Sequence, residues 1–184
     1  AEADLLSGHR DAILDRREVS KDLRVVIDCG NGAGSVITPY LLSLMGIATL
    51  PLNCHTGGFF ARPSEPQEGG LGYVAEMVKA GSADCGVVHD GDADRMVGLD
   101  NKGRFIDGDR LLVLFARYLD AKRVVTTTDA SMIIEEVAQV QRTQVGDTYV
   151  SERLRTWGDL GGEPSGAWIF PDHSLCPDGI YAAA

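Results

Sequence analysis

Basic residues are scarce in this chain of 184 residues, which has 17 Lys and Arg against 27 Asp and Glu and a formal net charge of −10. Proteins that bind nucleic acid usually carry a basic face, so this charge balance predicts no nucleic-acid partner. An anionic substrate would have to be met by local Arg, Lys, backbone amides or a metal ion, because the net charge repels it.

Cysteine pairs and long apolar runs are also missing. The four cysteines are widely spaced and form no CxxC, which argues against a zinc knuckle or a dithiol redox motif. No apolar run reaches the ~20 residues that a membrane helix needs. The first four residues, AEAD, are acidic, and no apolar signal segment follows them. We therefore expect a cytoplasmic protein with reduced thiols and no membrane contact.

The remaining composition is that of an ordinary globular protein, with 44% hydrophobic and 24% charged residues. A chain of this length can bury a real core and predicts one domain or two small ones. Short β-branched runs alternate with amphipathic segments in the first half, which is the pattern of βαβ units. The expected strands are at 24–28, 47–52, 84–88, 96–99 and 104–106, and the expected helices at 4–17, 36–45 and 71–80.

The second half repeats this alternation. Asp109 is expected to cap a helix whose apolar positions run from 111 to 118. Further strands are expected at 123–127, 142–145 and 168–170, further helices at 131–140 and 148–157, and the first turn of a helix at 178–184. The predicted fold is α/β, with two similar consecutive domains, each a mixed sheet with helices packed on it. We place their boundary between residues 104 and 105.

The most informative motif is DGDADR at residues 90–95, which follows the expected strand 84–88. Asp90, Asp92 and Asp94 alternate along a short turn, where their carboxylates can converge on one hard cation, and Mg²⁺ prefers a few carboxylates plus substrate phosphate. Arg95 adds a planar donor suited to phosphate oxygens. An EF-hand would need Gly at loop position 6, where Arg95 stands, and a haloacid-dehalogenase-type phosphatase would carry a different motif after its first strand. A solvated acidic turn is the plain alternative.

Two glycine-rich segments accompany this acidic loop. GNGAG at residues 30–34 lacks the GxGxxG spacing of a dinucleotide site and the GK[ST] of a P-loop, so we interpret it as a tight turn that permits close packing. GGEPSG at residues 161–166 places Glu163 and Ser165 two positions apart on a turn. Both side chains are expected to be exposed and can hydrogen-bond neighbouring sugar hydroxyls. Taken alone, however, the segment is typical of a surface turn.

Four segments, in this order, resemble the α-D-phosphohexomutase family, which includes phosphoglucomutases, phosphomannomutases and phosphoglucosamine mutases. They are VVIDCGNGAGS at 25–35, DGDADR at 90–95, VGDTYV at 145–150 and GGEPSG at 161–166. The resemblance covers nearly the whole chain and matches the middle domains, II at residues 1–104 and III at 105–184. It implies a Mg²⁺-dependent enzyme that interconverts hexose 1-phosphates and 6-phosphates through a 1,6-bisphosphate and a phosphoserine.

The resemblance also assigns roles. It implies that the three Asp residues of the acidic loop hold Mg²⁺, that Arg95 contacts the phosphoryl group, and that Glu163 and Ser165 bind the sugar. The phosphoserine domain and the C-terminal phosphate-binding domain have no counterpart in these residues, so we expect a fragment that ends in its last helix and is inactive alone.

Two departures from the family pattern leave the general acid and base open. Ala167 stands where many relatives have His, and Thr148 stands where they have a basic residue. The sequence does not separate glucose, mannose and glucosamine phosphates. A non-catalytic module that binds a sugar phosphate or a metal is the alternative function, and a nucleotide-dependent oxidoreductase is less favoured.

Overall fold

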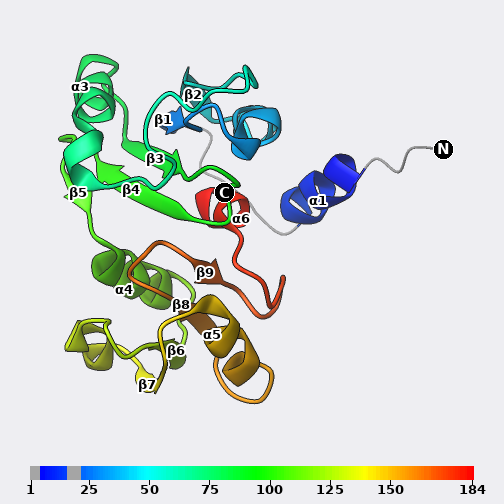
Figure 1. Ribbon diagram of the computed structural model, residues 1–184, viewed down its shortest axis with the longest axis vertical. Helices are drawn as coiled ribbons and strands as arrows, with labels where there is room; N and C mark the ends of the chain where they lie inside the picture. The colour runs from blue at the N-terminus through cyan, green and yellow to red at the C-terminus, as the bar shows by residue number, and fades with distance from the viewer. Residues whose placement is uncertain (1–4, 16–21) are drawn as a thin grey trace. The chain divides into compact units, whose positions relative to one another are not determined.

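The structure is a computed structural model that describes residues 5–15 and 22–184 (Figure 1). The described chain forms two compact units. The first takes the chain up to Ala93, Leu99–Phe105 and Ile180–Ala184, and the second takes Asp94–Gly98 and Ile106–Gly179. Each is an α/β unit built on a sheet, as the sequence predicts. Among the described residues, no helix has the length and apolar character needed to cross a bilayer.

The first sheet has the order β2-β1-β3-β4-β5. Strand β1 is parallel to both of its neighbours, β2 and β3. The strands are β1 (Arg24–Asp28), β2 (Ala48–Leu52), β3 (Cys85–His89), β4 (Met96–Asp100) and β5 (Phe105–Ile106). The helices are α1 (Leu5–Leu14), η1 (Ala33–Val36), α2 (Thr38–Leu44), η2 (Glu68–Gly70) and α3 (Gly72–Ala80).

The crossover helices of this sheet lie on opposite faces. Right-handed connections that run from β1 outward to β2, and then back across β1 to β3, require this arrangement. Figure 1 shows α3 on one side of the strands and the segment of α2 on the other. Val74 and Val78 of α3 are fully buried, at the helical spacing that packs one face on a sheet. Each such side chain contributes about 1.5–3 kcal/mol through burial.

The second sheet has the order β7-β6-β8-β9, with β6 parallel to β7 and β8, and β8 antiparallel to β9. Its core includes Val125, Val150, Leu154 and Ile169. The strands are β6 (Arg123–Thr127), β7 (Gln139–Thr143), β8 (Leu160–Gly162) and β9 (Trp168–Ile169). The helices of this unit are α4 (Gly108–Tyr118), η3 (Met132–Glu136) and α5 (Asp147–Leu154). The last helix, α6 (Gly179–Ala183), belongs to the first unit from Ile180 onward.

One pattern of contacts recurs in both sheets. The amide of Arg24, which opens β1, donates to the carboxylate of Asp84 at 2.8 Å. The amide of Arg123, which opens β6, donates to the carboxylate of Asp159 at 3.0 Å. Because Asp84 and Asp159 directly precede β3 and β8, the acidic loop after β3 and the GGEPSG loop after β8 start from equivalent places in the two units.

The secondary structure differs from the expectations in several places. The helix expected at 131–140 is only the short η3, and β7 begins at Gln139, because pairing with β6 outweighs the helical pattern of this segment. Asp107, and not Asp109, caps α4 by accepting from the amide of Arg110 at 2.9 Å. Strand β8 was not expected, because two of its three residues are Gly, which weakens strand patterns.

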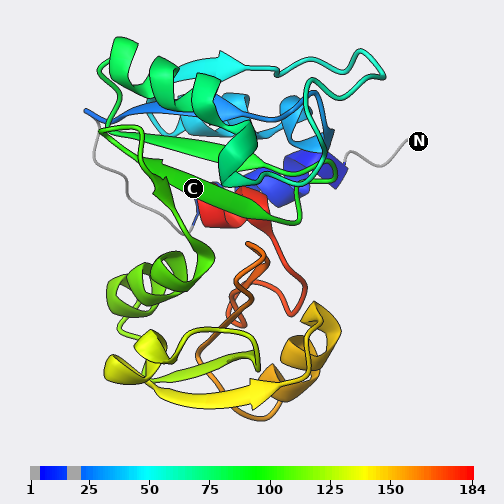
Figure 2. The same ribbon diagram turned by 60° about the vertical axis from the view of Figure 1, so that its left-hand side comes forward.

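The helix expected at 4–17 is α1, although residues 4, 16 and 17 of that prediction lie outside the described residues. Ile13 of this helix is fully buried, whereas Leu6 is 54% exposed. Figure 2 shows the long segment after β2, residues 53–70, as an excursion at the carboxyl end of β2. Ligands of open α/β sheets bind at this end of the strands, so the loops that gather there form the candidate site.

Candidate functional site

The acidic loop brings its three carboxylates together. One oxygen from each of Asp90, Asp92 and Asp94 lies within 4.8 Å of the others. Asp90 is buried, Asp94 is half-buried and Asp92 is exposed. Ala93 has a φ of +65°, a left-handed conformation that L-residues adopt only under constraint, and it turns the chain between the second and third Asp. The loop therefore offers a compact set of hard oxygen donors with one side open to solvent.

The glycine loop, residues 30–34, supports the acidic loop from within the first unit. The amide of Ala33 donates to the carbonyl of Gly91 at 2.9 Å. A Cβ atom at Gly32 would lie 2.3 Å from the same carbonyl oxygen, so only Gly permits this approach. The glycine loop is thus a tight turn that packs closely on its neighbour, as we interpreted it from the sequence.

His89, the last residue of β3, is fully buried. Its Nε2 lies 3.0 Å from the hydroxyl of Thr38, the first residue of α2. This contact attaches His89, which directly precedes the acidic loop in the sequence, to α2, the helix that follows the glycine loop. The acidic loop is therefore anchored on both sides of its first carboxylate.

Arg95 lies at the far end of the acidic loop and belongs to the second unit. It forms an isolated antiparallel bridge with Ala167, and the amide of Met96 donates to the carbonyl of Gly166 at 2.9 Å. Its Nε lies 3.8 Å from a carboxylate oxygen of Asp94, and a third of its side chain is exposed. Pairing of the segment that opens β4 with the GGEPSG loop thus places the guanidinium group near that loop.

Glu163 differs from the expectation of an exposed loop carboxylate, because only 8% of the residue is exposed. One of its oxygens, Oε1, accepts from the amide of Gly146 at 2.7 Å, at the N-cap of α5. Glu163 also closes a turn, since the amide of Gly166 donates to its carbonyl at 3.0 Å. Ser165, two residues later, is exposed. The two side chains therefore do not both project into solvent as the sequence suggested.

Burial raises the pKa of the Glu163 carboxyl group above its ordinary value. The carboxylates of Asp147 and Asp129 act in the same direction, whereas the Gly146 amide and the charge of Arg95 oppose it. The structure places Ala167 in the buried bridge with Arg95 and leaves Thr148 exposed in the first turn of α5.

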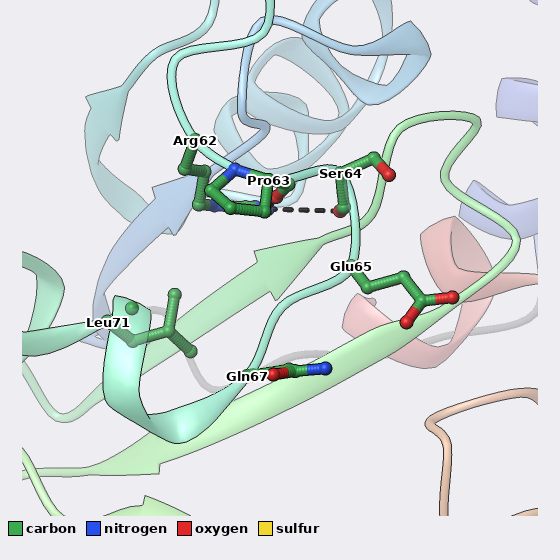
Figure 3. Close-up of a pocket in the computed structure, with 7 residues that line it drawn as sticks. Arg62, Pro63, Ser64, Glu65, Gln67 and Leu71 are labelled. Carbon is green, nitrogen blue, oxygen red and sulfur yellow. Dashed lines mark hydrogen bonds between the residues drawn. The ribbon is translucent and has the colours of Figure 1, made fainter.

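Sequence reasoning missed two residues that organise the first unit at this end of the sheet. Asp28, the last residue of β1, is fully buried, and Arg62 comes from the long segment 53–70 to meet it at 3.0 Å. A buried Asp in an apolar strand requires a partner, which was the available signal. The partner itself was not predictable, because the pair is far apart in sequence. Arg62 and its neighbours also line a pocket of about 330 Å³ (Figure 3).

Comparison with known proteins gives a consistent assignment. Residues 7–103 match the family model described as phosphoglucomutase/phosphomannomutase, alpha/beta/alpha domain II, and residues 107–184 match domain III of the same description. The chain is 50% identical over 182 residues to the "Probable phosphoglucosamine mutase" of Methanocella arvoryzae, covering 96% of the chain and 41% of that protein. It is 51% identical over 170 residues to a protein of the same name from Methanosarcina acetivorans, covering 88% of the chain and 39% of that protein.

A solved structure, the phosphoglucomutase/phosphomannomutase family protein of Burkholderia thailandensis, superposes with a TM-score of 0.87 at 25% identity. The match covers 97% of this chain and 42% of that protein. The chain therefore spans about two fifths of the length of the relatives that it matches.

Proposed function

Because the chain belongs to the phosphoglucomutase/phosphomannomutase family, we propose that it supplies the two central domains of a phosphohexomutase. The reaction is the interconversion of a hexose 1-phosphate and a hexose 6-phosphate through a 1,6-bisphosphate and an enzyme phosphoserine. The nucleophilic serine is proposed to come from a part of the full-length protein outside these 184 residues. The observation that carries the proposal is the convergence of three carboxylates directly after β3.

The donor set of the acidic loop fits Mg²⁺. Three carboxylate oxygens within 4.8 Å of one another match the preference of this hard cation for a few protein oxygens, with substrate phosphate completing the shell. Asp90, Asp92 and Asp94 would hold the ion. Bound Mg²⁺ would neutralise charge on the phosphoryl group during its transfer.

In the proposal, three side chains of the second unit bind and orient the substrate. Arg95, with a third of its side chain exposed, donates from its guanidinium group to phosphoryl oxygens. The hydroxyl of Ser165 and the second carboxylate oxygen of Glu163 hydrogen-bond to sugar hydroxyls, since the first oxygen is already engaged by Gly146. The raised pKa of Glu163 also makes it a candidate to hold a proton during the reaction.

An amino sugar is favoured as the substrate, because the two relatives compared above carry the name "Probable phosphoglucosamine mutase". We therefore propose glucosamine phosphate in preference to glucose or mannose phosphate. The test is turnover of the three 1-phosphates by the full-length protein, with Mg²⁺ and the corresponding 1,6-bisphosphate. A larger kcat/KM for glucosamine 1-phosphate supports the proposal, and equal values for all three would remove the substrate assignment.

The 184-residue chain alone provides the companion test. Since the proposed nucleophile lies elsewhere, the purified chain should convert none of the three 1-phosphates under the same conditions. Turnover by this chain would show that its own residues suffice and would overturn the assignment of the nucleophile.

A further inference from the structure

A buried ion pair between Arg62 and Asp28 lies next to the residue that precedes the acidic loop, His89. The guanidinium group of Arg62 approaches one carboxylate oxygen of Asp28 with its Nη2 at 3.0 Å and its Nε at 3.1 Å. The side chain of Arg62 is 6% exposed and that of Asp28 is fully buried. Burial of two charges carries a large desolvation cost, which only excellent geometry and further hydrogen bonds offset.

Asp28 receives those further hydrogen bonds from three neighbouring segments of the first unit. Its first oxygen also accepts from the amide of Gly30 at 2.9 Å, in the glycine loop. Its second oxygen accepts from the side chain of Asn53, after β2, at 2.7 Å and from the hydroxyl of Tyr73, in α3, at 2.6 Å. The carboxylate therefore joins β1, the glycine loop, β2 and α3 at one point.

Arg62 uses its other donors on backbone carbonyls. Its Nη1 donates to the carbonyls of Pro63 and Ser64, each at 3.1 Å, which folds the segment around the guanidinium group (Figure 3). Its Nη2 donates to the carbonyl of His89, the residue that directly precedes Asp90. One side chain thus connects the long segment 53–70 to the backbone at the start of the acidic loop.

The same segment also packs on the acidic loop itself. A Cβ atom at Gly91 would lie 3.1 Å from Cζ of Phe60 and 3.3 Å from Cβ of Ser64. The carbonyl of Gly91 also accepts from the amide of Ala33 at 2.9 Å. Two segments therefore contact the backbone between the first two carboxylates, and Arg62 fixes one of them, the segment 53–70.

We propose that Arg62 is a positioning residue for the cation site, acting through the carbonyl of His89 and through the packing of Phe60 and Ser64 on Gly91. This inference rests on the proposed function, in which the acidic loop binds Mg²⁺. Because Mg²⁺ demands near-ideal geometry, affinity depends on holding the carboxylates in place before the ion arrives. Residues that orient metal ligands typically change metal affinity by about 10–100-fold when altered.

A purely structural ion pair would behave differently. Its loss would lower the free energy of unfolding and leave the affinity of the folded protein for a cation unchanged. The decisive quantity is therefore the dissociation constant of a cation, measured on variants that circular dichroism shows to be folded at the temperature of the titration.

The test uses Mn²⁺ as the probe, with free Mn²⁺ followed by electron paramagnetic resonance. Arg62→Lys keeps the positive charge, but a single ammonium group cannot bond Asp28 and three carbonyls together. Phe60→Ala leaves the ion pair intact, and the residue is 57% exposed, so this variant should fold even if Arg62→Lys does not. Arg104→Lys is the matched control, because Arg104 pairs with Asp100 at 2.6 Å on the surface with 71% of its side chain exposed.

Relative to the unaltered chain, we expect Arg62→Lys to bind Mn²⁺ about tenfold more weakly. Phe60→Ala should also bind Mn²⁺ more weakly, and Arg104→Lys should bind it with the same affinity. If the unaltered chain binds Mn²⁺ and both folded variants bind it equally well, Arg62 has no positioning role, while the proposed function stands. If Arg62→Lys is unfolded, Phe60→Ala alone decides in the same way. Failure of the unaltered chain to bind Mn²⁺ removes the metal site and, with it, this inference.

Discussion

The amide of Ala33 donates a 2.9 Å hydrogen bond to the carbonyl of Gly91, which joins the glycine loop to the middle of the acidic loop. This bond crosses between the connections that follow β1 and β3. It shows why a glycine-rich turn without a nucleotide-binding pattern occurs after β1: its role is to let a second loop approach. The uncharged glycine loop therefore holds in place the backbone that carries the carboxylates.

Gly32→Ala should destabilise the protein, because the added Cβ would lie 2.3 Å from the Gly91 carbonyl oxygen and backbone must move. Such overpacking typically costs about 1–3 kcal/mol. Urea unfolding followed by circular dichroism measures the change. Gly69→Ala is the control, since nothing lies within 4 Å of the added atom. Equal stability of the two variants would show that the acidic loop moves away freely.

Asp92→Asn should weaken cation binding without loss of stability, because Asp92 is the exposed member of the carboxylate set. We expect the Mg²⁺ affinity measured by calorimetry to fall about tenfold or more. Changes to residues that only orient metal ligands already have an effect of this size, and Asp92 is proposed to bind the ion directly. Glu76→Gln removes the same charge from a surface site with 75% of its side chain exposed and is the control. A similar fall in the control would point to net charge and not to coordination.

Glu163→Gln should change the pH dependence of stability. The folded pKa of Glu163 is raised by burial above the ordinary value of 4.5, so the folded protein binds this proton more readily than the unfolded chain. Between those two pKa values, stability therefore falls as the pH rises. In the Gln variant this fall in stability is absent, and the side-chain oxygen can still accept a hydrogen bond from the amide of Gly146. Its Tm should exceed that of the unaltered protein at pH 7, and the difference should narrow as the pH approaches 4.5.

Thermal unfolding across this pH range, with Glu152→Gln as an exposed control in α5, measures the effect. A Gln variant that is less stable at pH 7 would mean that the ionised carboxylate has a favourable partner that outweighs its burial.

Ser165→Ala should lower kcat/KM of the full-length protein and leave its Tm unchanged. Ser165 is exposed, so it contributes little to stability, whereas a hydrogen bond to a sugar hydroxyl is worth about 0.5–1.5 kcal/mol. Glu163→Ala should lower kcat/KM by a factor that corresponds to about 1.5–3 kcal/mol of lost transition-state stabilisation, because a charged hydrogen bond is lost. Unlike Ser165→Ala, it should also lower stability, since the Gly146 amide loses its acceptor. Full activity of both variants would place the sugar elsewhere.

The sequence predicted those parts of the fold that depend on local patterns. The run Val25, Val26 and Ile27 is β-branched and apolar, and it forms β1 at the expected residues. The acidic loop was placed correctly after a strand, because its alternating Asp residues follow an apolar run. Strand β8 was missed, since Gly161 and Gly162 carry no side chain with which to signal a strand.

Contacts between distant segments were beyond the reach of such patterns. Asp28 and Arg62 are separated by the whole of α2 and β2, and nothing near Arg62 distinguishes it from a loop arginine. Glu163 was expected to be exposed because a Gly-Pro-rich turn usually is. Its burial follows from tertiary contacts of the turn, including the amide of Gly146.

The recurring contacts of Arg24 with Asp84 and of Arg123 with Asp159 give the acidic loop and the GGEPSG loop equivalent starting points in their respective units. Asp90 and Gly91 follow Asp84 at the same interval at which Ser165 and Gly166 follow Asp159. The two units therefore present different side chains from equivalent positions of a similar backbone: a carboxylate from Asp90 in one and a hydroxyl from Ser165 in the other. A single side-chain difference at this position is enough to distinguish the proposed cation site from the proposed sugar site.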